Sequence, residues 1–282
     1  TVAEQAESLR REYPNEVLRL CPDEPGIEWV EVQPLSEGSV KVDAALVKGI
    51  RSLIESRIQA EAAPPPPEKN PPACFVLSPP RSGSTLLRVM LAGHEGLFVP
   101  PELDLLAIDT LDQWEKYGEV RNSWRNGLVE ALRNVLGWSL EQTRSELGQW
   151  IRENRRSQEL YGLLQQGIGD RLLVDKTPGY SASLTILRKA EQWFRNARYI
   201  HLVRHPCDTI LSYQEYKLHL AIERTHPMVA GLLPAQIGEL TWLMSHDNIL
   251  RFLAEVPLER CCRIYFESLV AHPRQEMERV AR

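Results

Sequence analysis

The fold of this chain is decided by residues 74–87, which read CFVLSPPRSGSTLL. The apolar residues 74–77 indicate a buried strand, the small residues around Gly83 indicate a loop, and an amphipathic helix follows. A helix N-terminus has free backbone N–H groups, and small side chains let a phosphate approach them closely. The stretch therefore predicts an anion-binding loop, with a loop that merely starts a helix as the alternative.

The loop differs from the GxxxxGK[ST] pattern of nucleotide triphosphatases. Gly83 and Thr85 keep that pattern, but Ser78 stands in place of its first glycine and Ser84 in place of its lysine. A kinase or ATPase uses this lysine, together with Mg²⁺, to neutralise the charge of a triphosphate. Arg81 is the nearby cation here, so a P-loop kinase or NTPase is kept only as an alternative.

Beyond residue 72, short apolar runs alternate with amphipathic stretches, a pattern typical of a parallel sheet with crossover helices. Strands are expected at residues 73–77, 171–174, 198–203 and 262–266. Helices are expected between the first two strands at residues 124–136, 139–155 and 156–167, and Ser139 and Gln142 have capping-box spacing. The predicted fold class is α/β: a P-loop type parallel sheet flanked by helices, with a large helical insertion after the first strand, loop and helix.

Residues 80–86, PRSGSTL, resemble the 5′-phosphosulfate loop of sulfotransferases that use 3′-phosphoadenosine-5′-phosphosulfate (PAPS). The resemblance covers roughly residues 72–282, and residues 263–269, RIYFESL, look like the family's strand-and-turn signature. It implies a sulfotransferase that binds PAPS and releases 3′,5′-ADP. The implied ligands of the 5′ end are Arg81, Ser82, Gly83, Ser84 and Thr85.

A second candidate anion site follows the apolar run at residues 199–203. Arg204 comes at the carboxyl end of that expected strand, where open α/β sheets bind ligands. Pro206 is suited to the first turn of the next helix, in which Ser212 places a hydroxyl. A strand-end arginine alone is more often a salt-bridge partner. The resemblance implies instead that Arg204 and Ser212 bind the 3′-phosphate of PAPS.

Sulfuryl transfer requires a base for the acceptor hydroxyl and cations that stabilise negative charge on the transferred group. The resemblance implies that Glu102 is the base. The alternative is a carboxylate at the start of a helix over residues 103–111. It also implies that Lys176 faces the transferred group, with Arg81 as a second catalytic cation. His246, on an expected helix beside the acceptor pocket, either assists or replaces Glu102 or is an ordinary hydrogen-bonded histidine.

No spacing of His, Cys and carboxylate residues predicts a metal site. Asp175 ends an apolar run, which is a weak Mg²⁺ signal in P-loop NTPases, but without the loop lysine we interpret it as a coincidence. The resemblance implies that no cation cofactor is needed. A noncatalytic interaction domain with a relic nucleotide fold remains a third interpretation.

The first 63 residues fall outside the resemblance. Helices are expected over residues 3–11 and 43–62, with an extended patch at 29–32, and the apolar residues of the second helix follow a period of 3.6. The prolines of residues 64–72 predict a stiff polyproline II segment. The expected organisation is an N-terminal extension (1–63), a proline-rich linker (64–72) and a sulfotransferase domain (73–282).

The composition of the 282 residues is 43% hydrophobic and 25% charged, with a net charge of −5, so no basic surface predicts a nucleic-acid partner. No stretch predicts a membrane span or a signal peptide, and five cysteines without CxxC spacing favour the cytoplasm. The start at Thr1 and the end at Arg282, inside an expected helix, favour a piece of a longer polypeptide with neighbouring domains. Members of the family that the chain resembles usually continue with a segment that closes over the nucleotide, and the resemblance assigns no such segment up to Arg282.

Residues 81–87, 100–106 and 175–178 look more like bacterial sulfotransferases than like the cytosolic phenol and steroid enzymes. Some polyketide synthases carry such domains, including those that form terminal alkenes, where sulfation turns a β-hydroxyl into a leaving group. We therefore expect the acceptor to be the β-hydroxyl of an acyl chain on an acyl carrier protein. A free metabolite, lipid or saccharide is the alternative.

Overall fold

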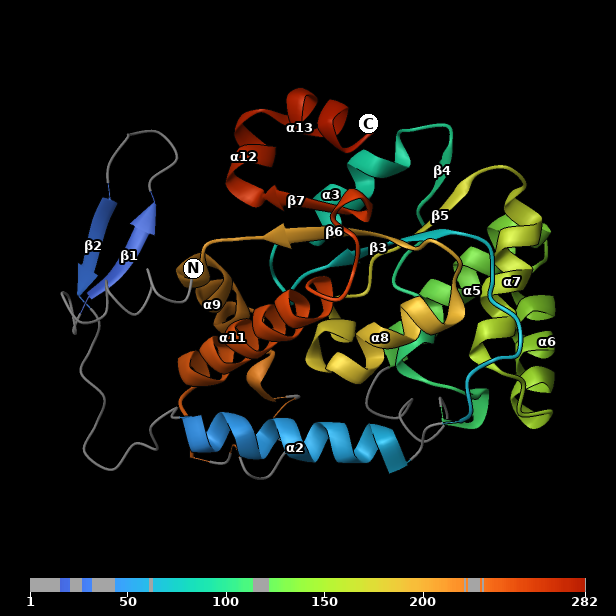
Figure 1. Cartoon of the computed structure of the whole chain (residues 1–282), viewed down its shortest axis with the longest axis horizontal. Coiled ribbons are helices and arrows are strands. Elements are labelled where there is room, and N and C mark those ends of the chain that lie inside the picture. Colours follow the sequence, from blue (N-terminus) through green and yellow to red (C-terminus); the bar gives the residue numbers. More distant parts are fainter. Residues whose placement is uncertain are drawn as a thin grey trace.

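The computed structural model describes residues 16–20, 27–31, 44–60, 63–113, 122–220, 222, 229 and 231–281. In this part of the chain five parallel strands form one sheet in the order β4-β5-β3-β6-β7 (Figure 1). Their bounds are Ala73–Leu77 (β3), Leu97–Phe98 (β4), Leu172–Asp175 (β5), Arg198–Val203 (β6) and Cys261–Tyr265 (β7). The predicted α/β class with a parallel sheet is confirmed.

Both faces of the sheet are covered, which explains why its strands read as continuous apolar runs. Phe75 and Leu77 of β3 pack into a core with residues of the helices on one face, whereas Cys74 and Val76 pack against the other. Figure 1 shows the first group of helices below the sheet and to its right, and the second above it. Their bounds are Asn122–Leu136 (α5), Leu140–Arg152 (α6), Ser157–Ile168 (α7), Leu184–Trp193 (α8) and Pro234–Leu253 (α11) for the first, and Ser84–Ala92 (α3), Phe266–Ala271 (α12) and Pro273–Val280 (α13) for the second.

Helices α5, α6 and α7 form the large insertion that the sequence predicts between the first strand, loop and helix and the next long strand. The side chain of Ser139 accepts the backbone N–H of Gln142 at 3.1 Å, so the predicted cap of α6 is present. The helix ends at Arg152, before the expected residue 155, and Asn154 has a left-handed φ of 51°. That conformation cannot continue a right-handed helix.

The N-terminal helix α2 (Ala44–Ala60) packs against α8 and α11. Ile50 is 3% exposed and lies in a core cluster with Ile237 and Leu240. The carboxylate of Glu55 accepts the backbone N–H of Leu184 at 2.8 Å, at the start of α8. Helix α2 therefore lies directly on the helices that cover the sheet.

The proline-rich segment is also attached to this body. Asn70 donates its backbone N–H to the carbonyl of Trp193 at 2.7 Å, and the carbonyl of Pro64 accepts from Arg156 at 3.0 Å. The division of the chain at residues 64–72 remains a prediction. Strands β1 (Glu16–Leu20) and β2 (Ile27–Glu31) pair antiparallel, and β2 includes part of the expected extended patch. The helix expected at residues 3–11 lies outside the described residues.

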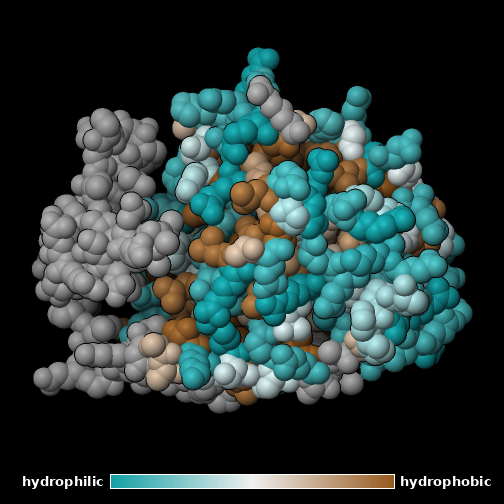
Figure 2. All heavy atoms as spheres, in the orientation of Figure 1, coloured by the Kyte–Doolittle hydropathy of each residue, from teal (hydrophilic) through white to brown (hydrophobic). Residues whose placement is uncertain are grey.

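On the face shown in Figure 2, hydrophobic residues emerge between hydrophilic ones mainly in the middle of the molecule, between the α12–α13 region and α2. Among the described helices, none has both the length and the apolar character needed to cross a bilayer.

Candidate functional site

The loop after β3 has an unusual backbone conformation. Gly83 has a φ of 82° and Arg81 a φ of 69°, and a positive φ is uncommon for any residue other than glycine. A Cβ atom on Gly83 would lie 2.1 Å from Cε2 of Phe266, so only glycine leaves room for that ring. Phe266, from the segment that resembles the family's signature, therefore packs directly on the loop.

Two buried hydroxyls lie at this loop. Ser82 and Ser78 are fully buried, and their Oγ atoms have no hydrogen-bond partner among the described residues. Burying a hydroxyl without a partner costs about 1–3 kcal/mol, so such groups are usually satisfied by a ligand or water. Together with the N-terminus of α3, which begins at Ser84, they are arranged to bind an anion.

The structure brings the two predicted anion sites together. Nε of Arg81 donates to Oγ of Ser212 at 3.1 Å, and Nη1 of Arg204 donates to the carbonyl oxygen of Arg81 at 3.0 Å. Ser212 lies in α9 (Pro206–Glu215), which begins with Pro206 as predicted. The loop after β3 and the end of β6 are thus directly joined, as a single nucleotide that binds both requires.

Aromatic rings support both guanidinium groups. The guanidinium of Arg81 lies 3.6 Å from the ring centroid of Tyr216, and that of Arg204 lies 4.7 Å from the centroid of Phe266. Nε1 of Trp242, from α11, donates to the carbonyl oxygen of Arg204 at 3.2 Å. Stacking and hydrogen bonding fix the two arginines in place.

On the other side of β3, Lys176 follows β5 and forms an ion pair with Glu102. Nζ of Lys176 lies 2.5 Å from Oε1 of Glu102, and the side chains are 4% and 40% exposed respectively. The buried lysine therefore presents its charge to a carboxylate that solvent, or an acceptor, can still reach. The structure brings these two predicted site residues together.

The helix considered over residues 103–111 is wrong. Asp104 has a left-handed φ of 56°, the 3₁₀ turn Leu105–Ala107 (η1) follows it, and α-helical backbone begins only at residue 111. The backbone of Glu102 is instead held close to α5, because a Cβ atom on Gly127 would lie 2.0 Å from the carbonyl oxygen of Glu102. The position of Glu102 is therefore not that of a carboxylate at the start of an α-helix.

His246 lies on α11 as predicted and is 6% exposed. Its Nδ1 atom is 3.0 Å from Nε2 of His201, a residue of β6. Burial lowers the pKa of His246 to about 4 and that of His201 to about 3, so both imidazoles are neutral near pH 7. Trp242, one helical turn earlier, contacts both His246 and Arg204, which places the histidine pair next to the carboxyl end of β6.

Sequence reasoning missed His201 and gave no structural role to Asp175. A single polar residue inside the apolar run YIHLV is the signal that marks His201. Asp175 accepts hydrogen bonds from Tyr161, Tyr180 and Thr177, so its carboxylate is already occupied. In the described part of the chain, no group of three or more His, Cys, Asp or Glu residues is arranged to hold a metal ion.

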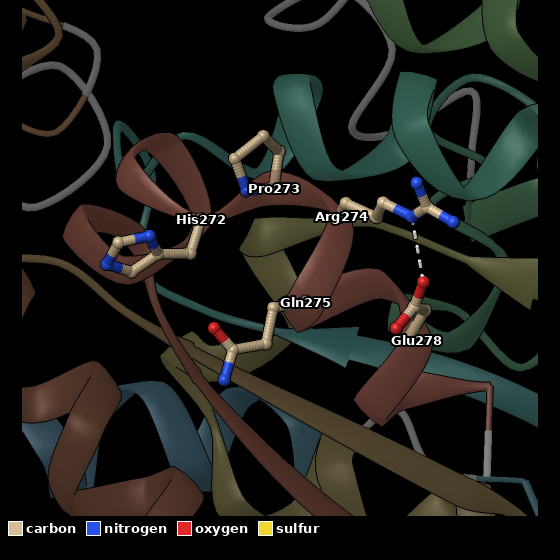
Figure 3. Close-up of a pocket in the computed structure, with 5 residues that line it drawn as sticks. All are labelled: His272, Pro273, Arg274, Gln275 and Glu278. Atoms are coloured by element: carbon tan, nitrogen blue, oxygen red, sulfur yellow. Dashed lines mark hydrogen bonds and ion pairs between the residues drawn. The ribbon is translucent and has the colours of Figure 1, made fainter.

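A surface hollow at the corner between α12 and α13 lies apart from these residues in sequence (Figure 3). It is lined by His272, Pro273, Arg274, Gln275 and Glu278, and Nε of Arg274 pairs with Oε1 of Glu278 at 2.9 Å. The side chain of Arg274 is 92% exposed. This exposed pair does not make the hollow a binding site.

Three comparisons agree with this geometry. A model of the sulfotransferase family matches residues 72–282. The sulfotransferase domain from the curacin biosynthetic pathway is 36% identical, with a TM-score of 0.69 over 76% of this chain and 73% of that one. The sulfotransferase domain from the Synechococcus PCC 7002 olefin synthase is 37% identical, with a TM-score of 0.70 over 78% of this chain and 75% of that one.

A more distant relative is the protein-tyrosine sulfotransferase A of Caenorhabditis elegans. It is 25% identical over 213 residues, which are 74% of this chain and 48% of that protein. This chain therefore spans about half the length of that relative.

Proposed function

Because this chain belongs to the sulfotransferase family, we propose that it transfers the sulfuryl group of PAPS to an acceptor hydroxyl. The observation that carries the proposal is the contact between the two anion sites. Arg204 bonds the backbone of Arg81, and Arg81 bonds Ser212, so the loop and the strand end form one continuous surface for a ligand with phosphate groups at both ends.

In the proposed complex, PAPS supplies an activated sulfuryl group. The small residues 82–85 at the start of α3 bind its 5′ end through backbone N–H groups and hydroxyls, with Arg81 as the loop's cation. Arg204 and Ser212 bind the 3′-phosphate. A 3′-phosphate distinguishes this donor from ATP, and the occupied carboxylate of Asp175 does not favour the Mg²⁺ site of a kinase.

For the transfer itself, Glu102 accepts the proton of the acceptor hydroxyl, since its carboxylate is reachable from solvent. Lys176 lies beside it and, with Arg81, stabilises negative charge as it develops on the sulfuryl oxygens. His246 is the second candidate for the base. Its neutral imidazole can accept a proton, although burial opposes the charge that it would then carry.

We propose that the acceptor is the β-hydroxyl of an acyl chain carried by an acyl carrier protein, and that this chain works next to other domains of a longer polypeptide in the cytoplasm. The support is the similarity, at 36% and 37% identity, to domains from the curacin pathway and from an olefin synthase. The alternative acceptors are a free metabolite, a lipid or a saccharide.

The test measures transfer of label from ³⁵S-PAPS to three forms of one β-hydroxyacyl group: on an acyl carrier protein, on free pantetheine, and as the free acid. We expect the carrier-bound form to give the highest kcat/KM. Preference for the free acid would reject the carrier protein as partner. Tight binding of ATP with Mg²⁺, without binding of 3′,5′-ADP, would replace the whole proposal by the kinase alternative.

A further inference from the structure

Asp175 is a buried carboxylate directly before Lys176 in the sequence. It is the last residue of β5, it is 1% exposed, and its register partner is Phe75 on β3. A carboxylate in a protein interior costs several kcal/mol unless hydrogen bonds compensate for the lost water. The surroundings of Asp175 must therefore supply donors.

Three hydroxyl groups from different segments supply these bonds. Oδ2 accepts from Tyr161 of α7 at 2.5 Å and from Tyr180 of the 3₁₀ turn Pro178–Ala182 (η2) at 2.8 Å. Oδ1 accepts from Oγ1 of Thr177 at 2.8 Å. Both oxygens are thus used inside the protein, which leaves this carboxylate a structural partner rather than a ligand for a substrate.

The protonation states suit this arrangement. Burial raises the pKa of both tyrosines well above its ordinary value, so both hydroxyls keep the protons that they donate. Burial also raises the pKa of Asp175, with a smaller contribution from the charge of Glu102, while the three hydroxyl donors oppose that rise. The carboxylate therefore depends on its donors to stay in the interior in its accepting form.

The same hydroxyls reach the segment that carries Glu102. Tyr180 accepts the backbone N–H of Leu106 at 3.2 Å, and Oγ1 of Thr177 lies 3.5 Å from the backbone nitrogen of Asp104. Lys176 stands between Asp175 and Thr177 in the sequence, so both of its neighbours belong to the network. One buried carboxylate thus connects the backbones that carry Lys176 and Glu102.

We propose that Asp175 and Tyr180 are positioning residues. They hold Lys176 and the segment that carries Glu102 in fixed positions relative to each other, at the carboxyl ends of the strands. This inference rests on the proposed function of Lys176 and Glu102. Tyr180 acts through the backbone of Leu106, and Asp175 acts by fixing the hydroxyl of Tyr180. Neither residue touches the reacting groups.

The chain offers a matched pair of variants. Tyr180→Phe removes the hydroxyl that joins Asp175 to Leu106, whereas Tyr161→Phe removes a hydroxyl that bonds the same carboxylate oxygen from α7. Both substitutions keep the ring and delete one donor to Asp175. The Tyr161 hydroxyl also lies 3.2 Å from that of Tyr180, but only the Tyr180 hydroxyl accepts from Leu106. A purely structural role predicts similar effects, while a positioning role predicts a much larger effect on Lys176 and Glu102 from Tyr180→Phe.

The first measurement does not depend on activity. Trace labelling of the full chain with acetic anhydride, read by mass spectrometry, gives the reactivity of Lys176 relative to Lys189, which is buried and paired with Asp109. Tyr180→Phe is expected to raise the relative labelling of Lys176 severalfold, and Tyr161→Phe to change it much less. Equal labelling of Lys176 in both variants and the parent chain would overturn the inference.

The second measurement is steady-state sulfuryl transfer. Tyr180→Phe is expected to lower kcat by about 10- to 100-fold with little change in the KM for PAPS, the scale expected for small misplacements of catalytic groups. Equal losses of kcat in the two variants would also overturn the inference. If the parent chain transfers no sulfuryl group, the proposed function fails, and the labelling result still decides whether Tyr180 positions Lys176.

Discussion

At the scale of single residues, Glu102 offers the most direct test of the proposed chemistry. Glu102→Gln keeps the size of the side chain and an oxygen for Lys176 but removes the base. Turnover is expected to fall by about 10²-fold or more, the usual contribution of a general base. Affinity for 3′,5′-ADP, measured by calorimetry, should stay the same. Unchanged turnover would leave His246 as the remaining candidate for the base.

Arg204 is expected to act on the nucleotide rather than on the transfer. Arg204→Ala should weaken binding of 3′,5′-ADP by about 1.5–3 kcal/mol, the range for hydrogen bonds to charged groups. The control ligand is 5′-AMP, which lacks the 3′-phosphate and should bind the parent and the variant alike. An equal loss of affinity for the two ligands would show that Arg204 only supports the loop through the carbonyl of Arg81.

A comparison of alanine variants at Gly83 and Gly137 distinguishes the effect of backbone strain from the effect of the contact with Phe266. Both have a positive φ, 82° and 67°, but a Cβ atom would meet the Phe266 ring at Gly83 and nothing within 4 Å at Gly137. Alanine at either position should cost roughly 1–2 kcal/mol of unfolding free energy from strain. Only Gly83→Ala should also reduce binding of 3′,5′-ADP. Equal binding by both variants would contradict the role assigned to the ring.

At the scale of elements, α2 is expected to stabilise the whole body although it precedes the residues that match the family model. Ile50→Ala should lower the unfolding free energy by about 2–5 kcal/mol, because the side chain is buried against α11. Leu53→Ala on the same helix is the control, since Leu53 is 37% exposed. Urea unfolding measures both, and similar small losses would show that α2 is not docked in solution.

The elements that sequence reasoning predicted are those with a long local pattern. Strands β3 and β6 have the expected bounds, and β5 and β7 are shifted by one residue. The edge strand Leu97–Phe98 has only two residues, which is too short for any periodicity. The leucines around Leu105 are all buried. Their apolar pattern therefore reflects their place in the core, not one face of a helix.

Within the candidate site, too, the residues in local motifs could be predicted, and the contacts between distant elements could not. The loop at Gly83 and the pair Arg204 and Ser212 could be found because each motif is local. The contacts of Asp175 with Tyr161 and of His201 with His246 join residues on different elements. Those contacts depend on the order of the sheet and on helix packing, neither of which a single sequence displays.

At the scale of the whole molecule, the order of the strands separates the residues proposed for sulfuryl transfer from those proposed to bind the 3′-phosphate. Strand β3 lies between β5 and β6, so its loop has Lys176 and Glu102 on one side and Arg204 with Ser212 on the other. The proposed transfer chemistry and the proposed nucleotide binding therefore meet only at Arg81 and the loop. Their separation explains why variants on the two sides are expected to change different measurements.

The stability of the whole molecule should fall in mild acid because of the histidine pair. The folded pKa values, about 3 for His201 and about 4 for His246, lie below the ordinary value of 6.5, so between about pH 6.5 and pH 4 the unfolded chain binds protons that the folded chain does not. Each histidine can then contribute a loss of up to about 1.4 kcal/mol per pH unit as the pH falls.

Urea unfolding at several pH values between these limits measures that slope. His201→Gln removes one of the two groups and should make the dependence on pH shallower. The same slope in the variant and the parent chain would assign the acid sensitivity to other groups.

The ring of Phe266 on Gly83 also has a consequence for biosynthesis on the ribosome. The loop after β3 is synthesised early, but Phe266, which packs on it, follows β7, the last strand of the sheet. In a nascent chain that does not yet include α12, the Phe266 ring is missing from Gly83, and Arg204 lacks the ring on which it stacks. The proposed binding of a nucleotide therefore requires synthesis of the chain through Phe266, after most of the helical layers are able to form.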